Sequence, residues 1–215
     1  MEFFNLNENS ILVSWKDELN SSLTRLISSY KTEILNLCKD DIKDCVQSIK
    51  SILIIIDLNR TSIDEIVDKI KMIDYEKINN YDKAIKVWEI PVCYDLEFAT
   101  DINLLSDLNN ISVRDIIETH LSKTYDVLSM GFLPGFMYLG KTDKKLHCER
   151  KEKPSLNIRK GSIGLALDQT CIYPRQSPGG WHIIGNSPIE FFNLNSKYPC
   201  FSKPGDMIKF VEISK

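Results

Sequence analysis

The first ninety residues contain neither glycine nor proline, whereas all nine glycines and all eight prolines lie from Pro91 onward. These two residue types mark positions where the backbone turns tightly or approaches another group closely. Their densest stretches are SMGFLPGFMYLG at 129–140 and KGSIGLALDQTCIYPRQSPGGWHIIG at 160–185. This distribution predicts a regular packing module, followed by a loop-rich module that carries the functional site.

The composition is that of an ordinary globular protein, with 43% hydrophobic and 27% charged residues. At 215 residues the chain can form one large or two small domains with substantial cores. The formal net charge is -3, and acids interleave with the lysines, so no basic stripe is present. This pattern argues against nucleic acid as a main partner.

Three further features favour a cytoplasmic location. The opening MEFFNLNENS lacks the basic and apolar regions of a signal peptide. The longest aliphatic run, ILIII at 52–56, is too short to span a membrane, so no membrane partner is expected. The six cysteines show neither a CxxC motif nor a spacing typical of zinc, which predicts free buried thiols and no metal site.

The first module is predicted to alternate strands and helices. A hairpin with its turn at 7–9 is followed by two strands further along, and the continuous apolar character of 51–57 suits a strand covered on both faces. A long helix lies between the hairpin and these strands. Its apolar face comprises Leu19, Leu23, Leu26, Ile27, Tyr30 and Ile34.

A second helix is expected to begin at Ser62, because Ser62 and Glu65 have the spacing of a capping box. The segment 83–92 then has the pattern of a strand that leaves this module. The resulting order is strand–helix–strand–strand–helix–strand. It is typical of a split βαβ sandwich with its helices on one face of an antiparallel sheet.

The second module is predicted to be mostly β structure. Two short helices are expected at 100–108 and 112–121, the second with a capping pair of Ser112 and Asp115. Short strand-like pieces separated by turns make up the rest of the chain. Many short strands with few helices indicate a closed or sandwiched β structure.

The stretch from Gly135 to Thr142, GFMYLGKT, matches the phosphate-binding pattern GxxxxGK[ST]. A true phosphate loop opens directly into a helix. Here the middle positions are apolar, and the following DKKLHCERKEKP lacks an apolar stripe, so we interpret the match as coincidental. GFLPGF at 131–136 is better explained as a rigid turn whose aromatic side chains either cover the core or form a pocket wall.

The segment SPGGW at 177–181 is the sharpest local signal. Two glycines between a proline and a tryptophan leave backbone amides unshielded by side chains. Such a loop can hold a carboxylate or phosphoryl oxygen in a small nest of N–H groups. The alternative is an ordinary turn into the strand that follows.

Polar candidates for a site are few. His120 lies on the apolar side of its helix, where a core histidine with a satisfied hydrogen bond is usual. His147 lies among charges, and His182 could face either side of its strand. Three arginines are candidates for gripping a carboxylate: Arg150, Arg159 and Arg175.

Three blocks in a fixed order carry a resemblance to a known family: GFLPGF at 131–136, QTCIYP at 169–174 and SPGGWHIIG at 177–185. With PVCYDLEF at 91–98 and PGDMIKFVEI at 204–213, essentially the whole chain resembles the B subunit of bacterial 5-oxoprolinase. This family is also called KipI or allophanate hydrolase subunit 1. The resemblance implies an α+β fold, with a ferredoxin-like split βαβ domain at 1–86 and a cyclophilin-like antiparallel β-barrel domain at 87–215.

The resemblance also implies an activity and partners. In this family the protein pairs with a KipA-type sister chain, and a LamB/YcsF-type protein joins them. Together they open 5-oxo-L-proline to L-glutamate at the expense of ATP, with magnesium as a candidate cofactor. The chain alone is expected to be inactive, and which of the three proteins contacts ATP stays open.

Site residues follow from the same resemblance. The candidate catalytic residues are His120, Arg150, Gln169 and Tyr173. The candidate substrate-binding residues are Phe132, Phe136, Ser177, Gly179, Gly180 and Trp181. We expect Arg150 to pair with the substrate carboxylate. Gln169 and Tyr173 would hydrogen-bond the ring or a phosphate. The amides of Gly179 and Gly180 would meet an oxyanion.

Departures from the family pattern cluster at this site. Where relatives usually have PRxxxPR, this chain has Glu149-Arg150 and Pro154-Ser155, and the glycine of QTG is replaced by Cys171. A paralogue acting on another lactam or amide therefore stays open. So does a regulatory role, because KipI-like members are associated with inhibition of a sporulation histidine kinase. Prolyl isomerase activity is suggested only by the barrel, and a shared fold does not transfer activity.

Overall fold

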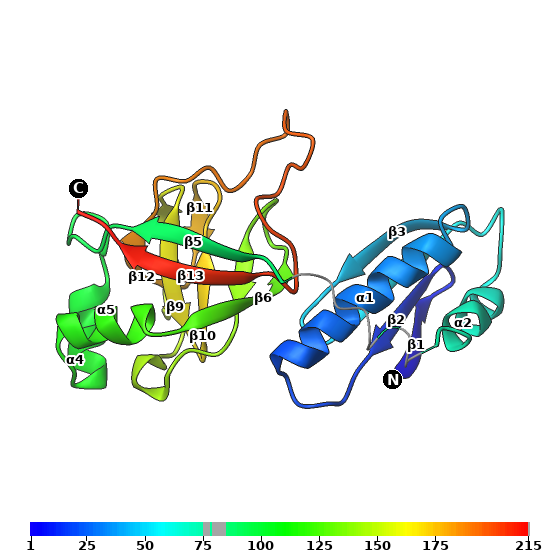
Figure 1. Ribbon diagram of the computed structural model, residues 1–215, viewed down its shortest axis with the longest axis horizontal. Helices are drawn as coiled ribbons and strands as arrows, with labels where there is room; N and C mark the ends of the chain where they lie inside the picture. Colours follow the sequence, from blue (N-terminus) through cyan, green and yellow to red (C-terminus); the bar gives the residue numbers. More distant parts are fainter. Residues whose placement is uncertain (75–77, 79–84, 215) are drawn as a thin grey trace. The chain divides into compact units, whose positions relative to one another are not determined.

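The computed structural model describes residues 1–74, 78 and 85–214 (Figure 1). The chain divides into two compact units, Met1–Ile85 (unit 1) and Lys86–Lys215 (unit 2). This division lies one residue before the boundary expected from the sequence. Each unit has a hydrophobic core of its own, which is a defining property of a domain.

Unit 1 contains an antiparallel sheet with strand order β1-β2-β4-β3. Its first two strands form the hairpin that the sequence predicts. The strands are β1 (Glu2–Asn7), β2 (Ser10–Ser14), β3 (Ile42–Gln47) and β4 (Ser51–Ile56), and the helices are α1 (Ser21–Leu37) and α2 (Ile63–Lys71).

Local sequence explains where these helices begin and which face they bury. The Asn20 side chain caps α1 by accepting the backbone N–H of Leu23. Ser62 and Glu65 form the expected capping box of α2. The apolar faces pack onto alternate residues of β2 and β4. From the helices, the core contains Leu23, Leu26, Ile27, Tyr30, Ile34, Ile66 and Ile70.

One expectation for this sheet was wrong, because the described residues of unit 1 cover only one face of β4. Alternate residues from Ile52 to Ile56 are buried, whereas Leu53 and Ile55 between them are half-buried. Both described helices pack on the same core, so the other face of β4 has no second layer in the described part of unit 1. A continuous apolar run was therefore not sufficient evidence of burial on two sides.

Unit 2 consists mainly of short strands. They are β5 (Val87–Val92), β6 (Thr124–Met130), β7 (Met137–Leu139), β8 (Ser155–Ile158), β9 (Ser162–Ala166), β10 (Gln169–Ile172), β11 (Ser177–Gly179), β12 (His182–Asn186) and β13 (Met207–Glu212). Seven of them form one sheet in the order β12-β9-β10-β7-β6-β13-β5, and β8 pairs with β11 separately. Together with the helices, this arrangement confirms the α+β class.

The sheet of unit 2 curls round on itself (Figure 1). Cys93, directly after β5, and Asn186 in β12 exchange backbone hydrogen bonds of 2.9 and 3.0 Å, so the two edges of the sheet meet. The expectation of a wholly antiparallel barrel was wrong at one pair, because β5 and β13 run parallel. These strands are far apart in the chain, so no short turn forces them into an antiparallel pair.

The segment 83–92 was expected to complete the first module. Residues 83 and 84 lie outside the described part, and Val87–Val92 pairs with β13 in unit 2 instead. The two predicted helices of this module are present as α4 (Ile102–Asn109) and α5 (Val113–Leu121), and the latter begins with the expected Ser112 capping box. No described helix is long and apolar enough to cross a membrane. All six cysteines are free thiols.

Candidate functional site

The strands β7, β9, β10 and β12 separate two groups of buried side chains. Side chains along a strand point alternately to opposite faces. From β10, Ile172 therefore joins the main core of unit 2, whereas Cys171 and Tyr173 face the other side. That other side carries an aromatic cluster, which comprises Leu133, Phe136, Tyr138, Ile158, Ala166, Cys171, Tyr173, Trp181 and Ile183.

The two glycine-rich stretches of the sequence meet in this aromatic cluster. The ring centroid of Phe136 lies 4.8 Å from that of Tyr173 and 6.2 Å from that of Trp181. Tyr138 lies 6.1 Å from Trp181. These packed rings give Trp181 a fixed orientation, because rings in mutual contact restrict one another's rotamers. Segments 129–140 and 160–185 thus both contribute side chains to the same face of the sheet.

The side chain of Tyr173 lies inside the aromatic cluster and is not accessible to a ligand. Its side chain is fully buried, and its hydroxyl has no hydrogen-bond partner among the described residues. Burial raises the pKa of this phenol. A Cβ placed on Gly179 would lie 2.2 Å from Tyr173 Oη and 2.8 Å from Ile158 Cδ1, so Gly179 covers the hydroxyl closely. This position does not fit the expected hydrogen bond from Tyr173 to a substrate.

The segment SPGGW is part of a regular pairing. Ser177–Gly179 forms β11, which pairs with β8, and the carbonyl of Gly180 accepts the backbone N–H of Lys151 at 2.9 Å. The Ser177 hydroxyl donates to the Pro178 carbonyl at 3.1 Å. Close packing therefore explains the glycine at 179 without an anion nest. The oxyanion role of the two amides stays a prediction.

Arg150 lies at the edge of the aromatic cluster. Its guanidinium carbon is 5.5 Å from the ring centroid of Trp181, which is within cation–π range. The side chain is exposed, and no carboxylate in the described part of the chain lies within ion-pair distance of it. A stacked guanidinium with free N–H donors is suited to binding a carboxylate in a bidentate way. This geometry fits the expected role of Arg150.

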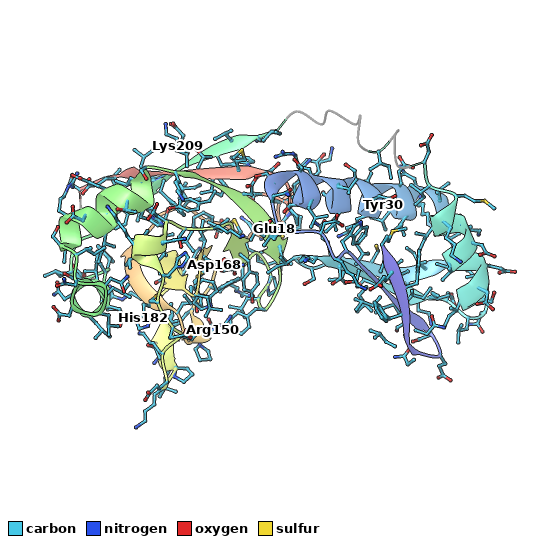
Figure 2. The ribbon with its side chains drawn as sticks, turned by 90° about the horizontal axis from the view of Figure 1, so that it is seen from below. Glu18, Tyr30, Arg150, Asp168, His182 and Lys209 are labelled. Carbon is cyan, nitrogen blue, oxygen red and sulfur yellow. The ribbon has the colours of Figure 1, made fainter. Side chains whose placement is uncertain are left out.

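Arg150 also lines a hollow of about 580 Å³ between α4 and the loop 148–155, here called the α4 hollow. Leu104 and Leu108 of α4 form an apolar wall, and the loop supplies the charged side. Figure 2 shows the labelled side chains of Arg150 and His182 close to each other on this side of unit 2. The volume is sufficient for a small metabolite.

Three residues of the α4 hollow were not among the expected site residues. Lys151 and Asp101 form an ion pair of 2.6 Å. His182 Nε2 lies 3.0 Å from the Glu149 carbonyl oxygen, so Nε2 donates to this oxygen. The buried Nδ1 of this ring has no hydrogen-bond partner in the described chain. No local pattern reveals these residues, because the fold joins segments that are distant in sequence.

His120 lies in the main core of unit 2 and not at the aromatic cluster. The Tyr94 hydroxyl is 2.8 Å from Nδ1, and Thr170 Oγ1 is 3.1 Å from Nε2. The imidazole is fully buried, and this burial lowers its pKa to about 3. A neutral ring sealed in the core does not fit the expected catalytic role. His120 thus lies in the core, as its position on the apolar side of the helix predicts.

Phe132 and Gln169 lie at the rim of the aromatic cluster. Phe132 is 62% exposed and has a φ of 70°, a left-handed conformation that aromatic residues rarely adopt. Its ring is 5.5 Å from that of Phe136. Gln169 begins β10, is half-buried, and shares a strand face with Cys171 and Tyr173. Their binding roles stay predictions.

The GxxxxGK[ST] match does not form a phosphate loop. Met137–Leu139 within it is strand β7, and only the single 3₁₀ turn η1 (Lys144–Leu146) follows. Within residues 1–74, 78 and 85–214, no three His, Cys, Asp or Glu side chains form a group that could hold a metal ion.

Comparison with known proteins gives similarity along nearly the whole chain. A family model described as carboxyltransferase domain, subdomain C and D, matches residues 1–202. The B subunit of 5-oxoprolinase from Bacillus subtilis (strain 168) is 28% identical over 220 residues, and the alignment covers 98% of this chain and 92% of that protein.

Solved structures similar to this chain include two single-chain matches of different extent. PH0987 from Pyrococcus horikoshii, described as a conserved uncharacterized protein, is 36% identical with a TM-score of 0.59, and the match covers 100% of this chain and 98% of that one. TTHA0988 is 24% identical with a TM-score of 0.85, and the match covers 96% of this chain. It covers only 40% of the TTHA0988 chain, and the likeness concerns the fold alone.

Proposed function

Because the chain belongs to the family of carboxyltransferase domains, subdomain C and D, we propose that it is one component of an ATP-dependent amidohydrolase complex. The proposed substrate is 5-oxo-L-proline, and the product is L-glutamate. Full-length similarity to the B subunit of a 5-oxoprolinase supports this reaction. The proposed partners are a KipA-type sister chain, which completes the site, and a LamB/YcsF-type protein. The chain alone is expected to be inactive.

The chemistry of the substrate explains why ATP is needed. A lactam is a resonance-stabilised amide, and the five-membered ring has too little strain to drive its own hydrolysis. Transfer of the γ-phosphoryl group of ATP to the lactam oxygen releases ADP. It also makes the carbon that bears this oxygen more electrophilic. Water then adds to this carbon, and the C–N bond breaks as the nitrogen takes a proton, which leaves an acyl phosphate. A second water hydrolyses the acyl phosphate to the side-chain carboxylate and inorganic phosphate. ATP, 5-oxoproline and two waters thus give ADP, phosphate and glutamate.

The position of Arg150 is the observation that carries this proposal. Its guanidinium stacks on Trp181, lines the α4 hollow and has no acidic partner in the described chain. We therefore propose that the Arg150 guanidinium binds the substrate carboxylate. A hydrogen bond to a charged group contributes about 1.5–3 kcal/mol. Replacement by alanine is therefore expected to raise KM for 5-oxoproline by about 10- to 150-fold.

The test is reconstitution of the purified chain with its two proposed partner proteins. Formation of glutamate and ADP should require ATP, 5-oxoproline and all three proteins. Arg150→Ala should raise KM and leave thermal unfolding unchanged. Arg175→Ala is the matched control, because Arg175 is another exposed arginine without an acidic partner among the described residues, and it lies outside the α4 hollow.

Two outcomes would contradict the proposal. An equal rise of KM in both arginine variants would remove Arg150 from the carboxylate site. A complete mixture that never turns over 5-oxoproline, while this chain suppresses histidine kinase autophosphorylation stoichiometrically, would favour the regulatory function instead.

The finer fold assignments belong to the same proposal. Two helices on one face of an antiparallel sheet support a ferredoxin-like unit 1, although its described strand order begins with the β1–β2 hairpin. The curled sheet of unit 2 supports a cyclophilin-like barrel. Neither assignment is used to derive the activity, because fold alone does not specify function.

A further inference from the structure

The side chains of Lys151 and Asp101 form an ion pair that is largely shielded from water. Lys151 Nζ lies 2.6 Å from Asp101 Oδ2, and the two side chains are 15% and 14% exposed. Nζ also donates to Ser155 Oγ at 2.9 Å. Two partners therefore hold a normally flexible ammonium group in one place.

The attachment of α4 to β12 does not require this lysine. The backbone N–H of Asp101 donates to the Ile183 carbonyl at 2.9 Å, and the Ile183 N–H donates to Asp101 Oδ2 at 2.7 Å. Shielding an ion pair from water carries a desolvation cost, and apolar replacement of both partners is often no less stable. A purely structural role therefore accounts poorly for an ammonium group at this position.

The Lys151 ammonium has one donor left over. It carries three N–H groups, and two are directed at Asp101 and Ser155. Within the described residues it makes no third hydrogen bond. Lys151 and Arg150 line the same α4 hollow, so a fixed ammonium and an unpaired guanidinium border one space.

We infer that Lys151 is a substrate-binding residue whose free N–H meets the lactam oxygen, while Arg150 holds the carboxylate. This inference rests on the proposed function. In 5-oxoproline the carboxylate and the carbonyl flank the ring nitrogen on either side, so two neighbouring cations can each meet one acceptor. An ammonium group is a compact point charge suited to the negatively charged phosphoryl group that the lactam oxygen receives, and it acts best when held in advance.

The acidic residues around the α4 hollow support the assignment of Lys151 as a substrate-binding residue. Glu149 and Glu152 border the hollow beside Asp101, so it has no large excess of positive charge. Binding of an anionic substrate therefore depends on individual donors that are correctly placed. Lys151 is such a donor, since Asp101 and Ser155 fix its position.

The test uses the reconstituted three-protein complex, with 5-oxo-L-proline and ATP as the probes. Lys151→Met should lower kcat about 100- to 1000-fold, because removal of one preorganised donor from a group that gains charge in the transition state has an effect of this order. KM for 5-oxoproline should change less than threefold, since Arg150 still holds the carboxylate. Arg150→Ala should instead raise KM for 5-oxoproline and change kcat less.

A double variant separates a binding role from a structural one. Lys151→Met leaves Asp101 enclosed and uncompensated, so the single variant is expected to unfold at a lower temperature. Adding Asp101→Asn removes both charges and should restore the unfolding temperature but not kcat. Recovery of kcat to within threefold of wild type would overturn the inference. So would a double variant that stays as unstable as Lys151→Met, because the pair would then serve the fold itself.

The control pair is Lys69 and Asp41 in unit 1, whose Nζ–Oδ2 distance is also 2.6 Å. The double variant Lys69→Met with Asp41→Asn should leave kcat within twofold of wild type. A loss matching that of the Lys151 pair would show a general effect of removing ion pairs, and the inference would fail. An inactive wild-type complex would instead refute the proposed function, and this inference with it.

Discussion

The buried imidazole of His120 is expected to make unit 2 less stable in mild acid. Thr170 Oγ1 donates its proton to the Gly164 carbonyl at 3.0 Å, so it accepts the Nε2 proton of His120. Nδ1 therefore keeps a lone pair and accepts the Tyr94 hydroxyl at 2.8 Å. This network suits the neutral ring, and burial lowers the pKa of His120 to about 3. Protonation in the folded state would break it.

The size of the effect follows from the two pKa values. In the unfolded chain the imidazole has a pKa of about 6.5, so it binds a proton there long before the folded state does. The contribution to stability is complete above pH 6.5 and is lost as the pH falls from 6.5 toward 3. At pH 5, about 1.5 units below the unfolded pKa, the loss is about 2 kcal/mol.

Urea unfolding at pH 7.5 and pH 5 measures this loss. Fluorescence of a Trp15→Phe background reports unit 2, because Trp15 lies in unit 1 and the other two tryptophans, Trp88 and Trp181, lie in unit 2. The free energy of unfolding should fall about 2 kcal/mol further in this background than in the same chain with His120→Gln. The remaining histidines are common to both and cancel in the difference.

Equal losses in the two chains would show that His120 does not cause the loss of stability in acid. If His120→Gln does not fold, proton NMR of the wild-type imidazole provides a second measurement. Its ring signals should stay constant from pH 8 to pH 4.5. A titration of the His120 ring with a midpoint near 6 would show that the folded state accepts the proton, and the argument from burial would fail.

Two further predictions concern packing and capping. Gly179→Ala should destabilise unit 2 by about 1–3 kcal/mol, because the new methyl group overlaps Tyr173 Oη. Tyr173→Phe alone should leave stability nearly unchanged, because the removed hydroxyl has no partner in the described chain. Combined with Gly179→Ala, it should recover part of the lost stability. Thermal unfolding of the two single variants and the double variant measures both effects. Ser62→Ala should cost unit 1 about 1 kcal/mol by removing one half of the capping box with Glu65, and urea unfolding followed by Trp15 fluorescence measures it.

Features encoded in short stretches of sequence could be predicted. The capping boxes at Ser62 and Ser112 and the hairpin around 7–9 were all predicted correctly. Each depends on residues within one or two turns of the chain, so spacing alone specifies the local hydrogen bonds. The core position of His120 follows in the same way from its helix face.

Features that depend on distant pairing could not be predicted from spacing. The parallel partner of β5 lies at the other end of unit 2, and nothing in Val87–Val92 identifies it. The ion pair of Lys151 with Asp101 likewise exists only because the loop 148–155 passes beside α4. For β4, the apolar run gave the strand correctly but not the number of covered faces, since burial is decided by the other elements of the fold.

The glycines of the second module illustrate how a correct signal can have a different cause. Gly179 and Gly180 were expected to expose amides for a ligand, yet a Cβ on Gly179 would lie 2.2 Å from Tyr173 Oη. At Gly164, too, a Cβ would lie 2.9 Å from Trp181 Cβ and 3.1 Å from Cys171 Sγ. Gly164 and Gly179 thus allow large rings to pack closely on the outer face of the curled sheet. That packing fixes Trp181, on which Arg150 stacks. The glycines therefore contribute to the proposed site indirectly, by making a rigid support for the cation that receives the substrate.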